Sequence, residues 1–157
     1  MRKIIKVFVL AILITACSSS VDSNKKMAGD FLDLALSANP LDAQELTHPE
    51  FKFVFMGNTE ISNIPNDRDA YFDYWLPEVV GKLLPNGITL TTTDMIADED
   101  SVAVIMEGDA EGINGEYDNK YVFVYKFKDG KIFSIHEYNS DLLVSTRLYK
   151  NKLVPSD

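Results

Sequence analysis

The C-terminal half of the chain alternates apolar and polar residues in four successive stretches, and a period of two is typical of β-strands. Short segments rich in Asp, Asn and Gly separate these stretches. Tight turns of that composition join antiparallel neighbours, so this half predicts a four-stranded antiparallel meander. The expected strands cover residues 88–97, 101–111, 117–127 and 131–138.

The N-terminal half shows helical spacing instead. Residues 25–38 carry apolar side chains along one helical face, and residues 41–46 predict a short second helix. A third helix is expected over 67–83, where Pro77 predicts a kink or a break. Phenylalanines alternate with other residues over 51–55, which predicts one early strand. Helices that precede a meander predict an α+β domain, with the helices on one face of a curved sheet.

The geometry of the turns over 113–115 and 128–130 decides which side chains share the inner face of the sheet. Three-residue turns at both places would align Glu107, Tyr121 and Glu137 in one inner row. Two-residue Asn-Gly and Asp-Gly turns would still keep the two glutamates on one face, whereas a mixed pair would separate them. We prefer the three-residue turns, because they leave the inner face apolar except for that row. The next inner row would contain Ile105, Phe123 and Ile135.

The first residues are typical of a leader. Basic residues precede a short apolar run over 7–14, and the run ends in Leu-Ile-Thr-Ala-Cys. That ending resembles the lipobox of bacterial lipoproteins, and Cys17 is the only cysteine, so it has no internal disulfide partner. We expect a signal peptide over 1–16, a lipidated Cys17 with a flexible tether over 17–24, and one domain over 25–157. Ser18 resembles the outer-membrane sorting pattern, which predicts a bacterial cell-envelope protein at the periplasmic face of the outer membrane.

The charge of the chain excludes one large class of partner. The formal net charge is −9, and it becomes about −12 when Arg2, Lys3 and Lys6 leave with the leader. Such a surface repels phosphate backbones, so we expect no nucleic-acid binding. His48 and His136 fall on different predicted elements among scattered acids, so we expect no metal site.

Helices before strands, the motif Tyr117-x-Asn119-x-Tyr121, and Asp129-Gly130 followed by Glu137-Tyr138 together resemble the SnoaL-like branch of the nuclear transport factor 2 superfamily. This resemblance implies a cone-shaped, cystatin-like curved sheet around a pocket that helices close. Members include polyketide cyclases, ketosteroid isomerases and limonene epoxide hydrolases. The chain departs from the epoxide hydrolases, because phenylalanines stand at 53 and 55 and no arginine lies over 103–109.

These observations predict a pocket that binds a small, mostly apolar molecule without a cofactor. Glu137 and Glu107 are the candidate catalytic residues, because burial and like charge raise a carboxyl pKa and suit it to proton transfer. An isomerase, cyclase or hydrolase activity would fit, and the alternatives are that the glutamates anchor a ligand or have a purely structural role. The second hypothesis is a non-catalytic module that forms a homodimer or docks a protein through the outer sheet face, with Val122, Val124 and Ile132 as its apolar centre. The expected ligand-binding residues are Phe53, Phe55, Tyr74, Trp75, Ile105, Tyr121, Phe123 and Ile135.

Overall fold

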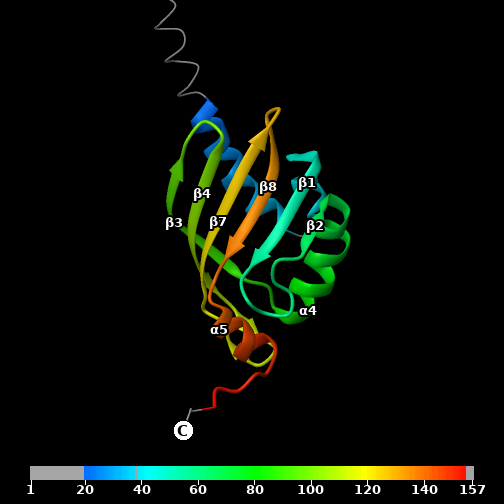
Figure 1. Cartoon of the computed structure of the whole chain (residues 1–157), viewed down its shortest axis with the longest axis vertical. Coiled ribbons are helices and arrows are strands. Elements are labelled where there is room, and N and C mark those ends of the chain that lie inside the picture. Colours follow the sequence, from blue (N-terminus) through cyan, green and yellow to red (C-terminus); the bar gives the residue numbers. More distant parts are fainter. Residues whose placement is uncertain (1–19, 38, 155–157) are drawn as a thin grey trace, which may run out of the picture.

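A six-stranded curved sheet with the strand order β2-β1-β8-β7-β4-β3 forms the centre of the protein (Figure 1). The computed structural model describes residues 20–37 and 39–154. The predicted α+β class is confirmed, and the meander is present, but the sheet is mixed because β1 runs parallel to β8. The strands are β1 Thr47–Met56, β2 Pro65–Asp67, β3 Thr89–Ala97, β4 Ser101–Asp109, β7 Lys120–Lys128 and β8 Lys131–Tyr138, and the separate hairpin is β5 Glu111–Gly112 with β6 Gly115–Glu116.

The helices cover the inner face of this sheet. The long N-terminal helix, which includes residues 20–35, crosses behind the strands in Figure 1. Residues 20–24, which we expected in the tether, are helical, and Asn24 is buried and donates to the Glu99 carbonyl at 3.0 Å. The signal peptide, Cys17 and the tether residues 17–19 lie outside the described residues.

The second layer of helix runs without interruption from Arg68 to Leu83. It consists of α3 Arg68–Ala70, the π-helical segment η1 Tyr71–Val80 and α4 Gly81–Leu83. Asp67 caps it by accepting from the Ala70 amide at 3.0 Å. Pro77 lies inside η1, and the helix continues through it without a break, because the wider turns absorb the missing donor of the proline. The remaining helices are α2 Leu41–Gln44, α5 Asp141–Leu143 and η2 Val144–Leu148.

The hairpin between β4 and β7 has a turn that we did not predict. Gly112 pairs with Gly115, so the turn consists of Ile113 and Asn114 alone. The same register continues into the sheet, where Glu107 pairs with Lys120. Relative to the preferred register, β4 is therefore shifted by one residue, which reverses its faces. The inner face of β4 carries Val102, Val104 and Met106, and its outer face carries Ala103, Ile105 and Glu107.

The hairpin between β7 and β8 differs from the preferred register in another way. Lys128 pairs with Lys131, and the two-residue turn Asp129-Gly130 has φ angles of 52° and 71°, as a type I′ turn requires. Phe133 then forms a bulge, because Ile132 pairs with Phe127 and Ser134 with Lys126. Turn and bulge together shift the register by an even number of residues. The predicted faces of β7 and β8 are therefore kept, although Glu137 pairs with Phe123 rather than with Tyr121.

An aromatic cluster joins the helices to the sheet. Phe31 on the N-terminal helix is fully buried and lies edge-on to Tyr125 of β7, with ring centroids 6.2 Å apart. The ring centroid of Tyr71 on η1 lies 4.8 Å from that of Phe53 on β1 and 6.0 Å from that of Phe31. These contacts hold both helical layers against the concave side of the sheet, and the space left between them is the site described next.

Candidate functional site

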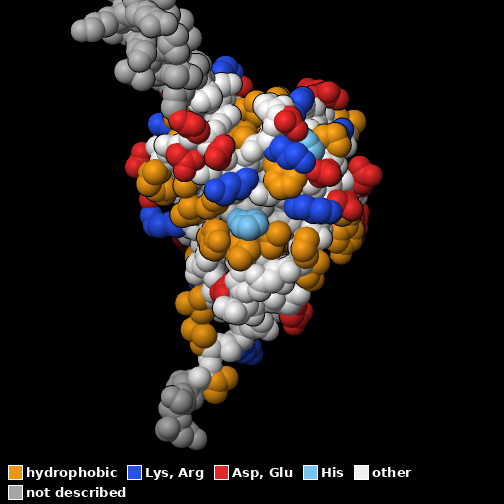
Figure 2. Space-filling view, turned by 45° about the horizontal axis from the view of Figure 1, so that its top comes forward, with side chains coloured by type: hydrophobic (Ala, Val, Ile, Leu, Met, Phe, Trp, Pro, Cys, Tyr) orange, Lys and Arg blue, Asp and Glu red, His pale blue; other side chains and the backbone are white. Residues whose placement is uncertain are grey.

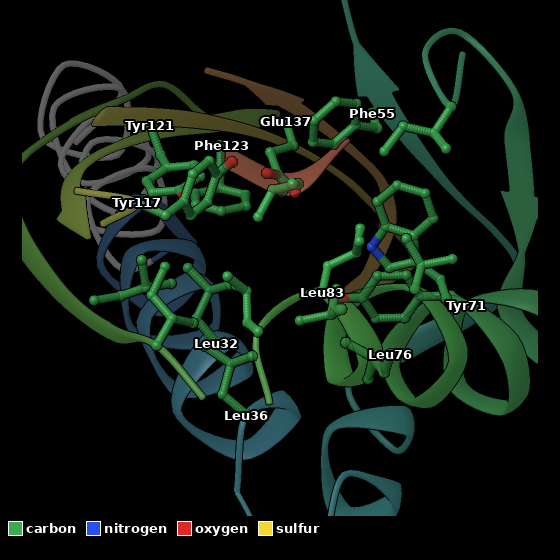
Figure 3. A pocket seen from close by; sticks show the side chains of 18 residues that line it. Leu32, Leu36, Phe55, Tyr71, Leu76, Leu83, Tyr117, Tyr121, Phe123 and Glu137 are labelled. Atoms are coloured by element: carbon green, nitrogen blue, oxygen red, sulfur yellow. The ribbon is translucent and has the colours of Figure 1, made fainter. Parts of the chain in front are cut away.

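A cavity of about 80 Å³ lies between the inner face of the sheet and the two long helices (Figure 3). Strands contribute one wall, on which Glu137 points into the cavity beside Phe123 and Phe55. Helices contribute the opposite wall, on which Leu36, Leu76 and Leu83 face the sheet. The complete lining is Leu32, Leu36, Phe55, Ile61, Tyr71, Trp75, Leu76, Val79, Val80, Leu83, Leu84, Ile88, Leu90, Tyr117, Tyr121, Phe123, Glu137 and Leu148.

Glu137 is the only residue with a charged side chain among the described residues that line this cavity. The pairing of β8 with β1 and β7 places it between Phe55 and Phe123 in one inward row. Glu137 as a whole residue is half-buried, because part of its surface borders the cavity. Its carboxyl group is nevertheless surrounded by protein atoms. Burial raises the pKa of the Glu137 carboxyl from 4.5 to about 7, and a hydrogen bond from Asn139 Nδ2 to Oε1, at 3.0 Å, opposes this rise.

Three tyrosines bring phenol hydroxyls into the same apolar lining. Burial raises the pKa of Tyr71 and of Tyr121 well above the usual range, and it raises the pKa of Tyr117 to about 12. The negative charge of Glu137 raises each of these pKa values further. All three hydroxyls therefore stay protonated at neutral pH and can donate hydrogen bonds.

Tyr117 is held by a buried polar network. Its hydroxyl oxygen accepts from Asn119 Nδ2 at 3.0 Å, and the neighbouring Tyr121 hydroxyl, like Asn119, lowers the pKa of Tyr117. Asn119 is 2% exposed, and its Oδ1 accepts from the Ser140 amide at 3.2 Å. The network thus connects the start of β7 to the start of α5 and orients Tyr117 at the cavity.

The ring of Tyr121 lies directly on the backbone of β4. A Cβ atom at Gly108 would come within 2.7 Å of Tyr121 Cε2 and 2.9 Å of Ile88 Cδ1. Only glycine at this position lets both side chains reach the cavity wall without a shift of the strand.

The structure brings half of the predicted site residues together. Phe55, Trp75, Tyr121, Phe123 and Glu137 line the cavity. Phe53 and Ile135 are 1% exposed and lie in the inward row next to that of Glu137, outside the lining. Tyr74 and Ile105 do not lie in the cavity: Tyr74 is 58% exposed on the outer side of η1, and Ile105 is on the outer face of β4.

The predicted inner position of Glu107 is wrong. Its side chain lies on the outer face of the sheet, 57% exposed, and forms an ion pair with Lys120. The two-residue turn at Ile113 and Asn114 is the physical reason, because it reverses the faces of β4 relative to β7. Glu107 and Glu137 therefore do not form a catalytic pair.

Sequence reasoning also missed cavity residues on the helices. The π-helical turns of η1 bring residues five apart onto one face, so Leu76 and Val80 line the cavity and Tyr74 does not. Pro77 was the available signal, because a proline inside an uninterrupted apolar pattern is compatible with a widened turn. Tyr117 precedes the predicted inner row and was assigned no role, although it belongs to the Tyr-x-Asn-x-Tyr motif.

The outer face of the sheet is mixed in character. Val122 and Val124 lie there half-buried, whereas Ile132, which we had expected beside them, is fully buried on the inner side of the Phe133 bulge. Figure 2 shows hydrophobic side chains around a histidine on this side of the molecule, with Lys and acidic side chains next to them. The apolar centre that the second hypothesis required is thus smaller than predicted.

Within residues 20–37 and 39–154, no three His, Cys, Asp or Glu side chains are grouped so as to hold a metal ion. None of the helices in that part of the chain is long and apolar enough to cross a membrane.

The protein is an α+β domain in which a curved sheet and helices enclose an apolar cavity with one acidic side chain. Comparison with known families and structures matches this architecture. Residues 28–135 match the SnoaL-like domain family, and the chain belongs to that family. No curated protein sequence matches the chain. The solved structures described below are 20% identical to this chain or less, so their similarity shows the fold alone.

Three solved structures illustrate the match. Bal32a, from a soil-derived mobile gene cassette, superposes with a TM-score of 0.71 at 17% identity, covering 83% of this chain and 98% of its own. A protein from Jannaschia sp. CCS1 assigned as a SnoaL-like polyketide cyclase gives 0.68 at 14% identity, covering 84% and 95%. A Bacillus subtilis protein assigned as an isomerase gives 0.67 at 20% identity, covering 83% and 95%. The fold of this chain is compatible with small-molecule binding.

Proposed function

We propose that the cavity binds the apolar part of a small molecule and that Glu137 exchanges a proton with it, without a cofactor. The observation that carries this proposal is one carboxyl group, with a pKa of about 7, in an otherwise apolar lining. A pKa near the working pH lets one group accept and return a proton with comparable ease. The names of two structural neighbours, a cyclase and an isomerase, agree with this class of chemistry.

The reaction class follows from the groups present. Ionised Glu137 would remove a proton from a carbon next to a carbonyl, and the electron pair of that C–H bond would move to the carbonyl oxygen. The resulting oxyanion needs a hydrogen-bond donor in a water-poor site. Protonated Glu137 would then return the proton to the same or a neighbouring carbon, which gives exchange or isomerisation with no net consumption of a reagent.

Tyr117 is the proposed donor to the oxyanion. Its hydroxyl oxygen already accepts from Asn119 Nδ2 at 3.0 Å. The hydrogen of Tyr117 itself is then free for a ligand. Hydrogen bonds accepted by the oxygen also polarise that hydroxyl and strengthen it as a donor.

Hydrogen–deuterium exchange of simple ketones tests this function. The purified protein is incubated in D₂O with cyclohexanone, acetophenone or 2-heptanone, and deuterium uptake is followed by mass spectrometry. We expect protein-dependent exchange that falls at least about 100-fold in Glu137→Gln and about 100-fold in Tyr117→Phe. Glu107→Gln is the matched control, because Glu107 lies outside the cavity. Equal rates for the wild type and Glu137→Gln would refute the proposal.

The cellular setting belongs to the same proposal. The leader-like segment and Cys17 support a lipid-anchored protein of the bacterial cell envelope, exposed at the periplasmic face of the outer membrane. An acidic chain tethered by a lipid would meet apolar small molecules close to the bilayer, where such molecules concentrate. A homodimer through the outer sheet face stays an alternative, which sedimentation of Val122→Lys against the wild type would test.

A further inference from the structure

A second, larger hollow lies directly outside the cavity. It is a groove of about 670 Å³ at the end of the N-terminal helix, bounded by η1 and by the ends of β3 and β4. The groove shares five of its apolar residues with the cavity, so a single layer of side chains separates the two spaces. The shared residues are Leu36, Leu76, Val80, Leu84 and Ile88.

We propose that the cavity and this groove are two halves of one binding site for an elongated amphipathic molecule. The less polar end of the molecule, which carries the reacting carbonyl, enters the cavity next to Glu137, and its polar, non-anionic end lies in the groove. Leu36 and its neighbours in the shared layer form the gate between the halves. This inference rests on the proposed function and adds the shape and the polarity of the ligand.

The volumes support a divided site. Ligand pockets in proteins usually measure about 300–1,000 Å³, and a cavity of about 150 Å³ already suffices for benzene. The cavity alone, at about 80 Å³, is too small for a typical ligand, whereas the groove of about 670 Å³ adds the missing space. A ligand that fills both must part the side chains of the shared layer.

The gate contains one residue suited to movement. Leu36 is 39% exposed, although it is a leucine that lines both spaces, and it lies just past the helical residues 20–35. In Figure 3, Leu36 and Leu76 stand on different helices across from Glu137. Displacement of Leu36 towards solvent would therefore open the cavity to the groove without disturbing the strands.

The groove has a different chemistry from the cavity. Its outer rim carries Ser37, Asn86, Thr89, Asp109 and Glu111. Asp109 and Glu111 are exposed, and within residues 20–37 and 39–154 neither forms an ion pair. Their charges repel an anionic end group and accept hydrogen bonds from a hydroxyl or an ammonium group.

Binding of simple alkyl probes tests the divided site. Trp75 is the only tryptophan and lines the cavity, so its fluorescence reports entry. The probes are butan-1-ol, octan-1-ol, octylamine and octanoate, each below its aggregation concentration. We expect octan-1-ol and octylamine to bind more tightly than butan-1-ol, by up to about fourfold per added methylene. Octanoate should bind at least about tenfold more weakly than octan-1-ol, because its carboxylate meets Asp109 and Glu111.

Charge variants show where the end group lies. In Asp109→Asn/Glu111→Gln, octanoate should approach the affinity of octan-1-ol. The matched control Glu45→Gln/Asp73→Asn removes two exposed charges outside both spaces and should keep the discrimination. Loss of discrimination in Glu137→Gln alone would place the end group in the cavity and overturn the inference, while leaving the proposed function standing.

Association rates test the gate. In stopped-flow experiments, Leu36→Ala should speed the entry of octan-1-ol several-fold, whereas Leu142→Ala, at another exposed leucine (50%) that lies on α5 outside both spaces, should not. Unchanged rates in Leu36→Ala, or tight binding of butan-1-ol with no gain from a longer chain, would overturn the divided site. Failure of every probe to bind, together with no ketone exchange, would overturn the proposed function as well.

Discussion

Replacing Glu137 by Gln should stabilise the protein at alkaline pH and leave its stability nearly unchanged at acid pH. Glutamine has the size of a protonated glutamate, and its Oε1 can still accept the hydrogen bond from Asn139. The variant therefore imitates the neutral form of Glu137 at every pH. Its comparison with the wild type isolates the free energy of ionising this one buried group.

The sign and the size follow from the pKa. The folded state holds the Glu137 proton up to about pH 7, while the unfolded chain releases it near 4.5. Between these values the folded state binds more protons, so the free energy of unfolding of the wild type falls as the pH rises. At about 1.36 kcal/mol for each pKa unit, the loss amounts to about 3 kcal/mol when both forms are ionised. It is nearly absent at pH 4 and nearly complete at pH 8.

Urea unfolding of both proteins between pH 4 and pH 8, followed through Trp75, measures this difference. The free energy of unfolding of Glu137→Gln minus that of the wild type should rise by about 3 kcal/mol across this range, and other titrating groups cancel in the subtraction. Glu107→Gln should show a difference within about 0.5 kcal/mol at every pH, since Glu107 is a surface residue. A flat profile for Glu137→Gln would mean that the carboxyl is hydrated and ionises normally, and the description of the cavity as an enclosed apolar site would be refuted.

Four further variants test packing and anchoring. Gly108→Ala should lower the free energy of unfolding by about 1–3 kcal/mol, because the added Cβ would lie 2.7 Å from Tyr121 Cε2. Gly29→Ala is the control in a helix, where the nearest atom to the added Cβ lies at 3.5 Å, and it should raise the free energy of unfolding by about 0.5–1 kcal/mol. Asp141→Ala should lower the free energy of unfolding by about 1 kcal/mol, because Asp141 Oδ2 accepts a hydrogen bond from the Asn58 amide at 2.9 Å. An unchanged urea unfolding curve would contradict a stabilising role for this bond. Cys17→Ser should move the protein from the membrane fraction to the soluble fraction after cell lysis, and an unchanged distribution would argue against lipidation.

The fold class could be predicted because alternation and turn composition are local properties of the sequence. Phe53, Tyr121, Phe123 and Glu137 point inward as alternation indicates. Pairing across strands depends instead on the number of residues in each turn and on the bulge at Phe133, and neither can be read from composition. The register of β8 against β7 differs from the preferred one by two residues, so Glu137 stays on the inner face. The register of β4 against β7 differs by one residue, so Glu107 lies on the outer face.

The helical wall of the site was hard to predict for another reason. Ordinary helical spacing assigns the face of η1 to residues three and four apart, while the π-helical turns around Pro77 widen that spacing. Leu76 and Val80 therefore reach the cavity, and Tyr74 points outward. Periodicity alone cannot anticipate this change, and Pro77 inside the apolar pattern is the local signal that accompanies it.

The placement of Glu137 argues for a role other than stability. An ionised carboxyl in this lining lowers the free energy of unfolding by about 3 kcal/mol at neutral pH, a large share of the 5–15 kcal/mol that holds a typical domain together. The Asn139 hydrogen bond does not depend on the charge, since a glutamine would accept it equally well. A glutamine would thus satisfy every described contact of Glu137 without the penalty of ionisation. What a glutamine could not do is exchange a proton near pH 7, and that single difference is why we assign the chemistry of the site to Glu137.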